Sequence, residues 1–101
     1  MDLNALMKQA QKMQKDLETT ESELKQKKYT SSVGGGVVEI TLNGGFQVEE
    51  LSIKEELLED GKEMLEEMIQ MAINNVLTQA TEDKEESMAS LTSGMNVPGM
   101  F

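Results

Sequence analysis

The sequence GGGVVEITLNGGFQVEELSI occupies residues 34–53 and carries the clearest structural pattern in the chain. Residues 38–42 alternate between apolar and polar side chains with a period of two, as expected for a strand with one buried face. Asn43-Gly44-Gly45 follows, and these residues accept a positive φ at low cost, which predicts a hairpin. The alternation resumes over residues 46–53 with one slip at Glu49-Glu50, which indicates a β-bulge.

On the N-terminal side of this hairpin, residues 28–33 are polar but rich in β-forming side chains. Three glycines, residues 34–36, separate them from the alternating strand. The sequence therefore predicts a three-stranded antiparallel meander with two open edges and one apolar face. Helices could cover that face, and a second sheet could pair with an edge.

Residues 2–28 contain no Gly or Pro and predict a helix over residues 3–27, capped by Asp2 or Asn4. Its apolar residues follow the 3-4 spacing of a heptad seam. The seam consists of Leu3, Leu6, Ala10, Met13, Leu17 and Leu24, with Thr20 filling the gap. A single stripe on so long a helix needs a partner, either inside its own subunit or in a second copy. Under the second alternative, the dimer interface would include Leu3, Leu6, Ala10, Met13 and Leu17.

The C-terminal half predicts one helical turn over residues 55–61 and then a long helix from Lys62 to Ser93, stopped by Gly94. This helix carries a wide apolar face with 3.6-residue spacing. The face consists of Leu65, Met68, Ile69, Ala72, Ile73, Val76, Leu77 and Ala80. Residues 81–87 are polar, so the helix is expected to project beyond the core. We assign residues 1–94 to a single domain and residues 95–101 to a loose tail.

Composition favours a core completed by a second copy of the chain. The 101 residues include nine Met, two Phe, one Tyr and no Trp. Flexible thioethers and few aromatic anchors make a weak core for one short chain.

The same composition argues against an enzyme. The absence of Cys and His removes disulfides, thiolate metal sites and the usual general base. Gly61-Lys62 lacks the residues of a phosphate loop, and the carboxylates are expected on solvated faces. No apolar run reaches the roughly 18 residues of a membrane span, and the N-terminus lacks a signal peptide. We expect a cytoplasmic protein without catalytic activity, metal, cofactor, small-molecule substrate or membrane partner.

Charge is distributed unevenly along the chain, whose formal net charge is −10. Residues 1–28 hold six Lys and five acids, whereas residues 29–101 hold three Lys and fourteen acids. Lys8, Lys12 and Lys15 form one exposed stripe opposite the seam, and Lys25, Lys27 and Lys28 continue the basic charge at the helix end. The stripe is either a solvated surface or a set of phosphate contacts. An acidic helical protein–protein adaptor with little DNA affinity is a further alternative.

Several stretches, taken in order, resemble the YbaB/EbfC family of bacterial nucleoid-associated DNA-binding proteins. Each stretch is weak alone, but together they cover nearly the whole chain without large gaps. They are residues 6–14 of the first helix, 34–44 of the hairpin, 57–60 and 63–66, Ala72 and Asn74, and 88–95 with Pro98.

The resemblance implies an α+β fold with an N-terminal helix, a three-stranded antiparallel sheet and a long C-terminal helix. It also implies an intertwined homodimer whose helical arms project like tweezers. Such a dimer would bind duplex DNA in the nucleoid, alter its conformation and influence gene expression. Carried over by position, DNA contact falls to Lys8, Lys12 and Lys15 on the first helix and to Lys84 on the second.

One departure from the family pattern concerns the second helix. Family members often carry basic residues at positions that here are Thr78, Gln79, Glu85 and Ser87. The second arm is therefore expected to be nearly neutral or acidic, and DNA binding weaker than in a basic relative.

Overall fold

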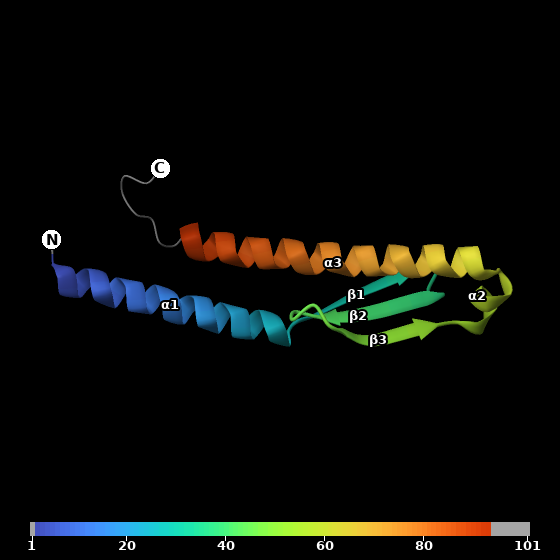
Figure 1. Ribbon diagram of the computed structural model, residues 1–101, viewed down its shortest axis with the longest axis horizontal. Helices are drawn as coiled ribbons and strands as arrows, with labels where there is room; N and C mark the ends of the chain where they lie inside the picture. The colour runs from blue at the N-terminus through green and yellow to red at the C-terminus, as the bar shows by residue number, and fades with distance from the viewer. Residues whose placement is uncertain (1, 94–101) are drawn as a thin grey trace.

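A computed structural model describes residues 2–93 as two long helices joined by a small sheet (Figure 1). The predicted α+β fold and its order of elements are confirmed. The elements are α1 (Leu3–Gln26), β1 (Lys28–Val33), β2 (Val38–Asn43), β3 (Val48–Ile53), α2 (Glu55–Glu59) and α3 (Lys62–Ser93). The predicted stop at Gly94 and the predicted tail, residues 95–101, lie outside the described residues.

The core lies between α3 and one face of the antiparallel sheet, whose strand order is β1-β2-β3. Val38, Ile40 and Leu42 alternate on β2 and are almost completely buried. Across from them, the small side chains Ala72 and Ala80 let α3 lie close to the strands. Full burial of such aliphatic side chains stabilises the fold by about 1.5–3 kcal/mol each. The other face of the sheet is polar, so the chain builds a single thin core.

The hairpin between β2 and β3 contains the expected bulge but a different turn geometry. Thr41 pairs with Glu50 and Leu42 pairs with Val48, so Glu49 is the extra residue, as the sequence predicted. The positive φ was expected within residues 43–45. It falls instead on Phe46, with φ of 61°. The reason is the three-residue loop, in which a left-handed residue must follow the β-turn that the Phe46 N–H closes on the Asn43 carbonyl.

Gly44 joins this hairpin to the end of α1. Its N–H donates to the Lys27 carbonyl at 3.0 Å. A Cβ at Gly44 would overlap the backbone carbonyl of Leu24, the buried residue of α1. The absence of a side chain therefore lets the hairpin touch the C-terminal turn of α1 and fix the direction in which that helix leaves the sheet.

Both long helices extend from the same end of the sheet (Figure 1). Asp2 caps α1 by accepting from the Asn4 N–H at 3.1 Å, and residues 3–15, here named the α1 arm, are exposed throughout. The molecule measures 70 × 25 × 17 Å and its radius of gyration is 20.0 Å. A compact domain of 100 residues has a radius of about 13 Å, so most of the helical surface lies outside any single-chain core.

Candidate nucleic-acid interface

The α1 arm presents a basic stripe without competing carboxylates. Lys8, Lys12 and Lys15 are all exposed, and residues 3–15 contain no acid. None of the three lysines forms an ion pair within residues 2–93. Seven residues of helix place Lys8 and Lys15 about 10 Å apart along the axis. The arm therefore offers three cations in a row to a polyanion.

Lys84 lies apart from this stripe, at the base of the arms. Its Nζ is 5.8 Å from the centroid of the Phe46 ring. It also lines a cavity of about 180 Å³ together with Glu21, Leu24, Lys25 and Gly44. The structure thus groups Lys84 with Lys25, which lies on another helix. Sequence spacing carries no signal for such a pair, because it depends on how α1 and α3 meet.

Two other lysines near the end of α1 are engaged by carboxylates. Lys27 Nζ lies 2.9 Å from Asp83 Oδ2, and Lys28 Nζ lies 3.6 Å from Glu49 Oε1. The sequence suggested that both continue the basic charge of α1. In the fold, each lysine is paired with a carboxylate that is distant in sequence, closely for Lys27 and more loosely for the exposed Lys28.

Asp83 joins α3 to the sheet through two donors. Its Oδ2 accepts from Lys27 Nζ and, at 2.6 Å, from the Tyr29 hydroxyl. The hydrogen bonds from Tyr29 and Lys27 lower the pKa of the Asp83 carboxyl. Burial, reinforced by the bond to Asp83 and its negative charge, raises the pKa of Tyr29 to about 12. The cluster holds α3 against β1 at the point where the arms leave the body.

Tyr29 provides a direct test of this cluster, because it is the one Tyr in a chain without Trp. Titration of phenolate absorbance should give a pKa of about 12 in the native protein and about 10 in denaturant. The folded-state pKa is raised, so Tyr29 stabilises the fold below pH 10, and this contribution is lost as pH rises towards 12. Asp83→Asn should lower the pKa of Tyr29 in the native protein only part of the way towards its value in denaturant, because the burial of Tyr29 remains. A Tyr29 pKa near 10 in the native, unmodified protein would contradict the contact between Tyr29 and Asp83.

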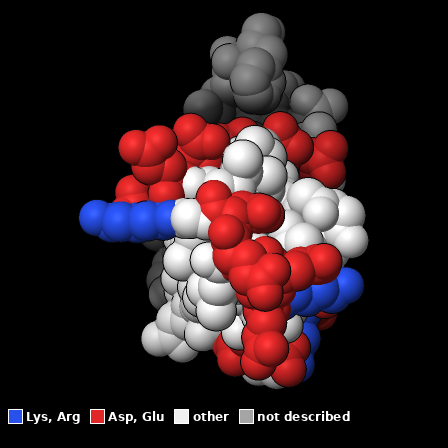
Figure 2. Space-filling view, turned by 90° about the vertical axis from the view of Figure 1, so that its right-hand side faces the viewer, with Lys and Arg blue, Asp and Glu red and all other residues white. Residues whose placement is uncertain are grey.

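The opposite end of the molecule is acidic. Figure 2 views this end, where red carboxylate side chains cover much of the surface between uncharged residues and outnumber the blue lysines. Residues 55–67 carry seven acids and one lysine. These acids are Glu55, Glu56, Glu59, Asp60, Glu63, Glu66 and Glu67. Like charge keeps a polyanion away from this end and favours approach to the arms.

The predicted seam is largely uncovered within one chain. Leu3 is 69% exposed, Leu6 42% and Met13 40%, and Ala10 is also exposed. Leu17 is half-buried near the body. No other part of residues 2–93 covers the first four of these residues, so within the described structure the seam is available to a partner.

A second apolar surface lies between α3 and β3. Val48 and Leu51 pair with the buried Leu42 and Ile40, so they share the apolar face of the sheet, yet each is at least half exposed. Ile73 and Leu77 on α3 are also exposed. The apolar face predicted from the sequence includes Ile73 and Leu77, so both were expected to be buried.

The orientation of α3 explains this exposure. Gln79 Nε2 donates to the Thr30 carbonyl of β1, and Lys84 approaches Phe46 on the opposite side. Ile73 and Leu77 share the side of Lys84 by helical spacing. The helix therefore covers β1 and β2 and leaves β3 open. We name Val48, Leu51, Ile73 and Leu77 the α3–β3 surface.

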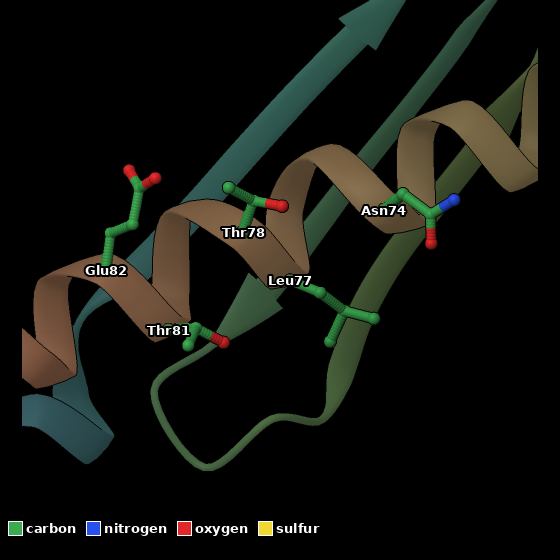
Figure 3. Close-up of a pocket in the computed structure, with 5 residues that line it drawn as sticks. All are labelled: Asn74, Leu77, Thr78, Thr81 and Glu82. Atoms are coloured by element: carbon green, nitrogen blue, oxygen red, sulfur yellow. The ribbon is translucent and has the colours of Figure 1, made fainter.

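A hollow of about 410 Å³ lies on the outer side of α3 (Figure 3). It is lined by Asn74, Leu77, Thr78, Thr81 and Glu82, all from one helix. Glu82 is its only carboxylate, so it has no opposed pair of acids for catalysis. Within residues 2–93, no group of three or more acids could hold a metal ion, and no helix is long and apolar enough to cross a membrane.

Known proteins share both the sequence and the fold. The model of the YbaB/EbfC DNA-binding family matches residues 1–95. A nucleoid-associated protein of Clostridium botulinum is 45% identical over 101 residues, covering 99% of this chain and 89% of the relative. One from Clostridium acetobutylicum is 41% identical over 100 residues, covering 98% and 89%.

Fold similarity extends to a solved structure. The crystal structure of an uncharacterized protein from Helicobacter pylori matches with a TM-score of 0.81 at 28% identity. The match covers 91% of this chain and 98% of the other. The resemblance inferred from the sequence is thereby confirmed, and the chain belongs to the YbaB/EbfC DNA-binding family.

Proposed function

We propose that the chain forms a homodimer that binds duplex DNA in the nucleoid, alters its conformation and thereby influences gene expression. The observation that carries this proposal is the stripe of Lys8, Lys12 and Lys15 on the α1 arm, exposed and unopposed by any carboxylate within residues 3–15. Each lysine that contacts a phosphate releases condensed counterions, which drives association.

The net charge of −10 is compatible with this proposal because the charges are separated in space. The acids of residues 55–67 lie at the far end of the molecule from the α1 arm (Figures 1 and 2). A dimer would present two stripes, or 2 × 3 = 6 lysines. The chain has no Arg, the side chain whose planar fork best fits the bidentate reading of guanine, so we expect DNA shape rather than base edges to set any preference.

Dimerisation is supported by the uncovered apolar surfaces. We propose that a second copy covers the α3–β3 surface and contacts the seam of Leu3, Leu6, Ala10, Met13 and Leu17. Burial of apolar side chains stabilises association by about 25 cal/mol per Å² before the cost of ordering. A chain with so thin a core gains much of its apolar burial from such a partner.

The test is binding of the unmodified protein to a labelled duplex at about 50 mM and 200 mM salt. Fluorescence anisotropy should show an affinity that falls by at least about 10³-fold across this range, the value expected for six phosphate contacts. Absence of duplex binding at the lower salt concentration would contradict the proposal.

A specific observation favours a second candidate function, that of a protein–protein adaptor. Residues 81–91 of α3 carry one lysine and four acids, Glu82, Asp83, Glu85 and Glu86. Together with residues 55–67, they give α2 and α3 an acidic surface suited to a basic protein. The adaptor predicts no measurable duplex affinity at low salt, so the same titration separates the two functions.

A further inference from the structure

Phe46 occupies an unusual position at the tip of the β2–β3 hairpin. This tip lies at the end of the sheet from which α1 and α3 extend (Figure 1). The side chain is 40% exposed although it is one of only three aromatic residues in the chain. Its φ of 61° is a conformation that favours glycine. Strained backbone of this kind occurs preferentially at ligand-binding sites.

The hairpin holds the Phe46 ring on a rigid support. Asn43 Oδ1 accepts from the N–H groups of Gly45 and Gln47, at 2.9 and 3.1 Å. Gly44 is fixed against the end of α1 through its bond to the Lys27 carbonyl. The loop is therefore ordered before any ligand arrives, which lowers the entropic cost of using the ring for binding.

Two lysines lie near the hairpin tip, one of them over the Phe46 ring itself. Lys84 Nζ lies 5.8 Å from the ring centroid. Lys84 and Lys25 line the same cavity beside Gly44, and Glu21 is the only carboxylate among its lining residues. An exposed ring with one ammonium group over it and a second beside Gly44 of the same hairpin matches the two surfaces of a nucleic acid, the π face of a base and the phosphate next to it.

We propose that Phe46 is a wedge that enters a base step of the bound duplex, while Lys25 and Lys84 bind the phosphates beside that step. The inference rests on the proposed function, because the ring meets DNA only when the α1 arm has bound it. Apolar side chains that enter a base step partly unstack it and bend the duplex. Phe46 would thus be the residue that converts DNA binding into a change of DNA shape.

The decisive variant is Phe46→Gly, because glycine accepts the positive φ without strain and the fold should be at least as resistant to urea. Energy transfer between dyes at the two duplex ends reports bending. The unmodified protein should raise the transfer, and Phe46→Gly should bind with at most about tenfold weaker affinity but without the bend. The dependence of its affinity on salt should be unchanged, since no phosphate contact is lost.

Two further variants test the proposed phosphate contacts and whether the bend depends on the hairpin tip. Lys25→Gln with Lys84→Gln removes 2 × 2 = 4 lysines per dimer, so the slope of log affinity against log salt should fall by about three to four. Leu58→Ala is the control, because Leu58 is 57% exposed but lies on α2 at the acidic end, and it should leave bending unchanged.

If the Phe46→Gly variant bends the duplex as much as the unmodified protein does, the wedge is overturned and the proposed function is left intact. Conversion of this variant to a monomer in light scattering would also overturn it, since Phe46 would then belong to the dimer interface. Unmodified protein that binds without bending would refute the wedge and the proposed change of DNA conformation, but would leave DNA binding itself intact. Unmodified protein that does not bind would refute the proposed function as well.

Discussion

Changing Lys8, Lys12 and Lys15 together to Gln is expected to weaken duplex binding by about 10³-fold near 200 mM salt. Six cations leave the dimer, so the slope of log affinity against log salt should fall by about five. The three side chains are exposed and have no ion-pair partner within residues 2–93, so the fold should be unaffected. Anisotropy measured over a salt series gives both numbers.

A matched control separates the stripe from total charge. Changing Lys28, Lys54 and Lys62 together to Gln removes the same charge, but from β1, the N-cap of α2 and the start of α3. Lys28 and Lys62 form only exposed ion pairs, which contribute little to stability. This variant should lose less than about tenfold in affinity. An equal loss in both triple variants would show that net charge, and not the α1 arm, governs binding.

Leu51→Lys is expected to convert the dimer to a monomer. Leu51 is 50% exposed on the apolar face of β3, where the second copy is proposed to pack. A dimer with two-fold symmetry would bury this lysine twice, and an unpaired buried charge is strongly unfavourable. Light scattering should report a mass of 11.2 kDa instead of twice that value.

Ser52→Lys is the control for this substitution. Ser52 pairs with Glu39 on the opposite, polar face of the same sheet, so the new lysine gains a cross-strand carboxylate. This variant should remain a dimer. If the Ser52→Lys variant dissociated while the Leu51→Lys variant stayed a dimer, the interface would lie on the polar face of the sheet, which would contradict the proposed packing.

Local patterns predicted most of the fold, because helices and hairpins are specified by neighbouring residues. The alternation of residues 38–42 identified β2, and the slip at Glu49-Glu50 identified the bulge. The first helix ends at Gln26, one residue before the predicted end. These features depend on side-chain periodicity and turn chemistry alone.

Features that depend on how distant elements meet were not predictable in the same way. The left-handed residue is Phe46 and not one of the neighbouring glycines, because loop length decides which position needs a positive φ. Ile73 and Leu77 belong to the apolar face in sequence, but α3 crosses only β1 and β2 and leaves them exposed.

The candidate site likewise contains one feature that local sequence predicts and others that depend on how distant elements meet. The stripe of Lys8, Lys12 and Lys15 follows from helical spacing and could be predicted as a unit. The contact of Lys27 with Asp83 and the shared cavity of Lys25 and Lys84 join residues more than fifty positions apart. Such pairs appear only once the end of α1, the hairpin and α3 are placed together.

The central claim is that the α1 arm meets the DNA, and site-specific cross-linking tests it most directly. The chain has no Cys, so a single introduced thiol can carry a photoreactive group at one defined position. Gln11→Cys places the group beside Lys12 on the α1 arm, and Glu59→Cys places it at the acidic end. We expect efficient cross-linking to duplex DNA from residue 11 and little from residue 59. Cross-linking from residue 59 that equals or exceeds that from residue 11 would contradict this account.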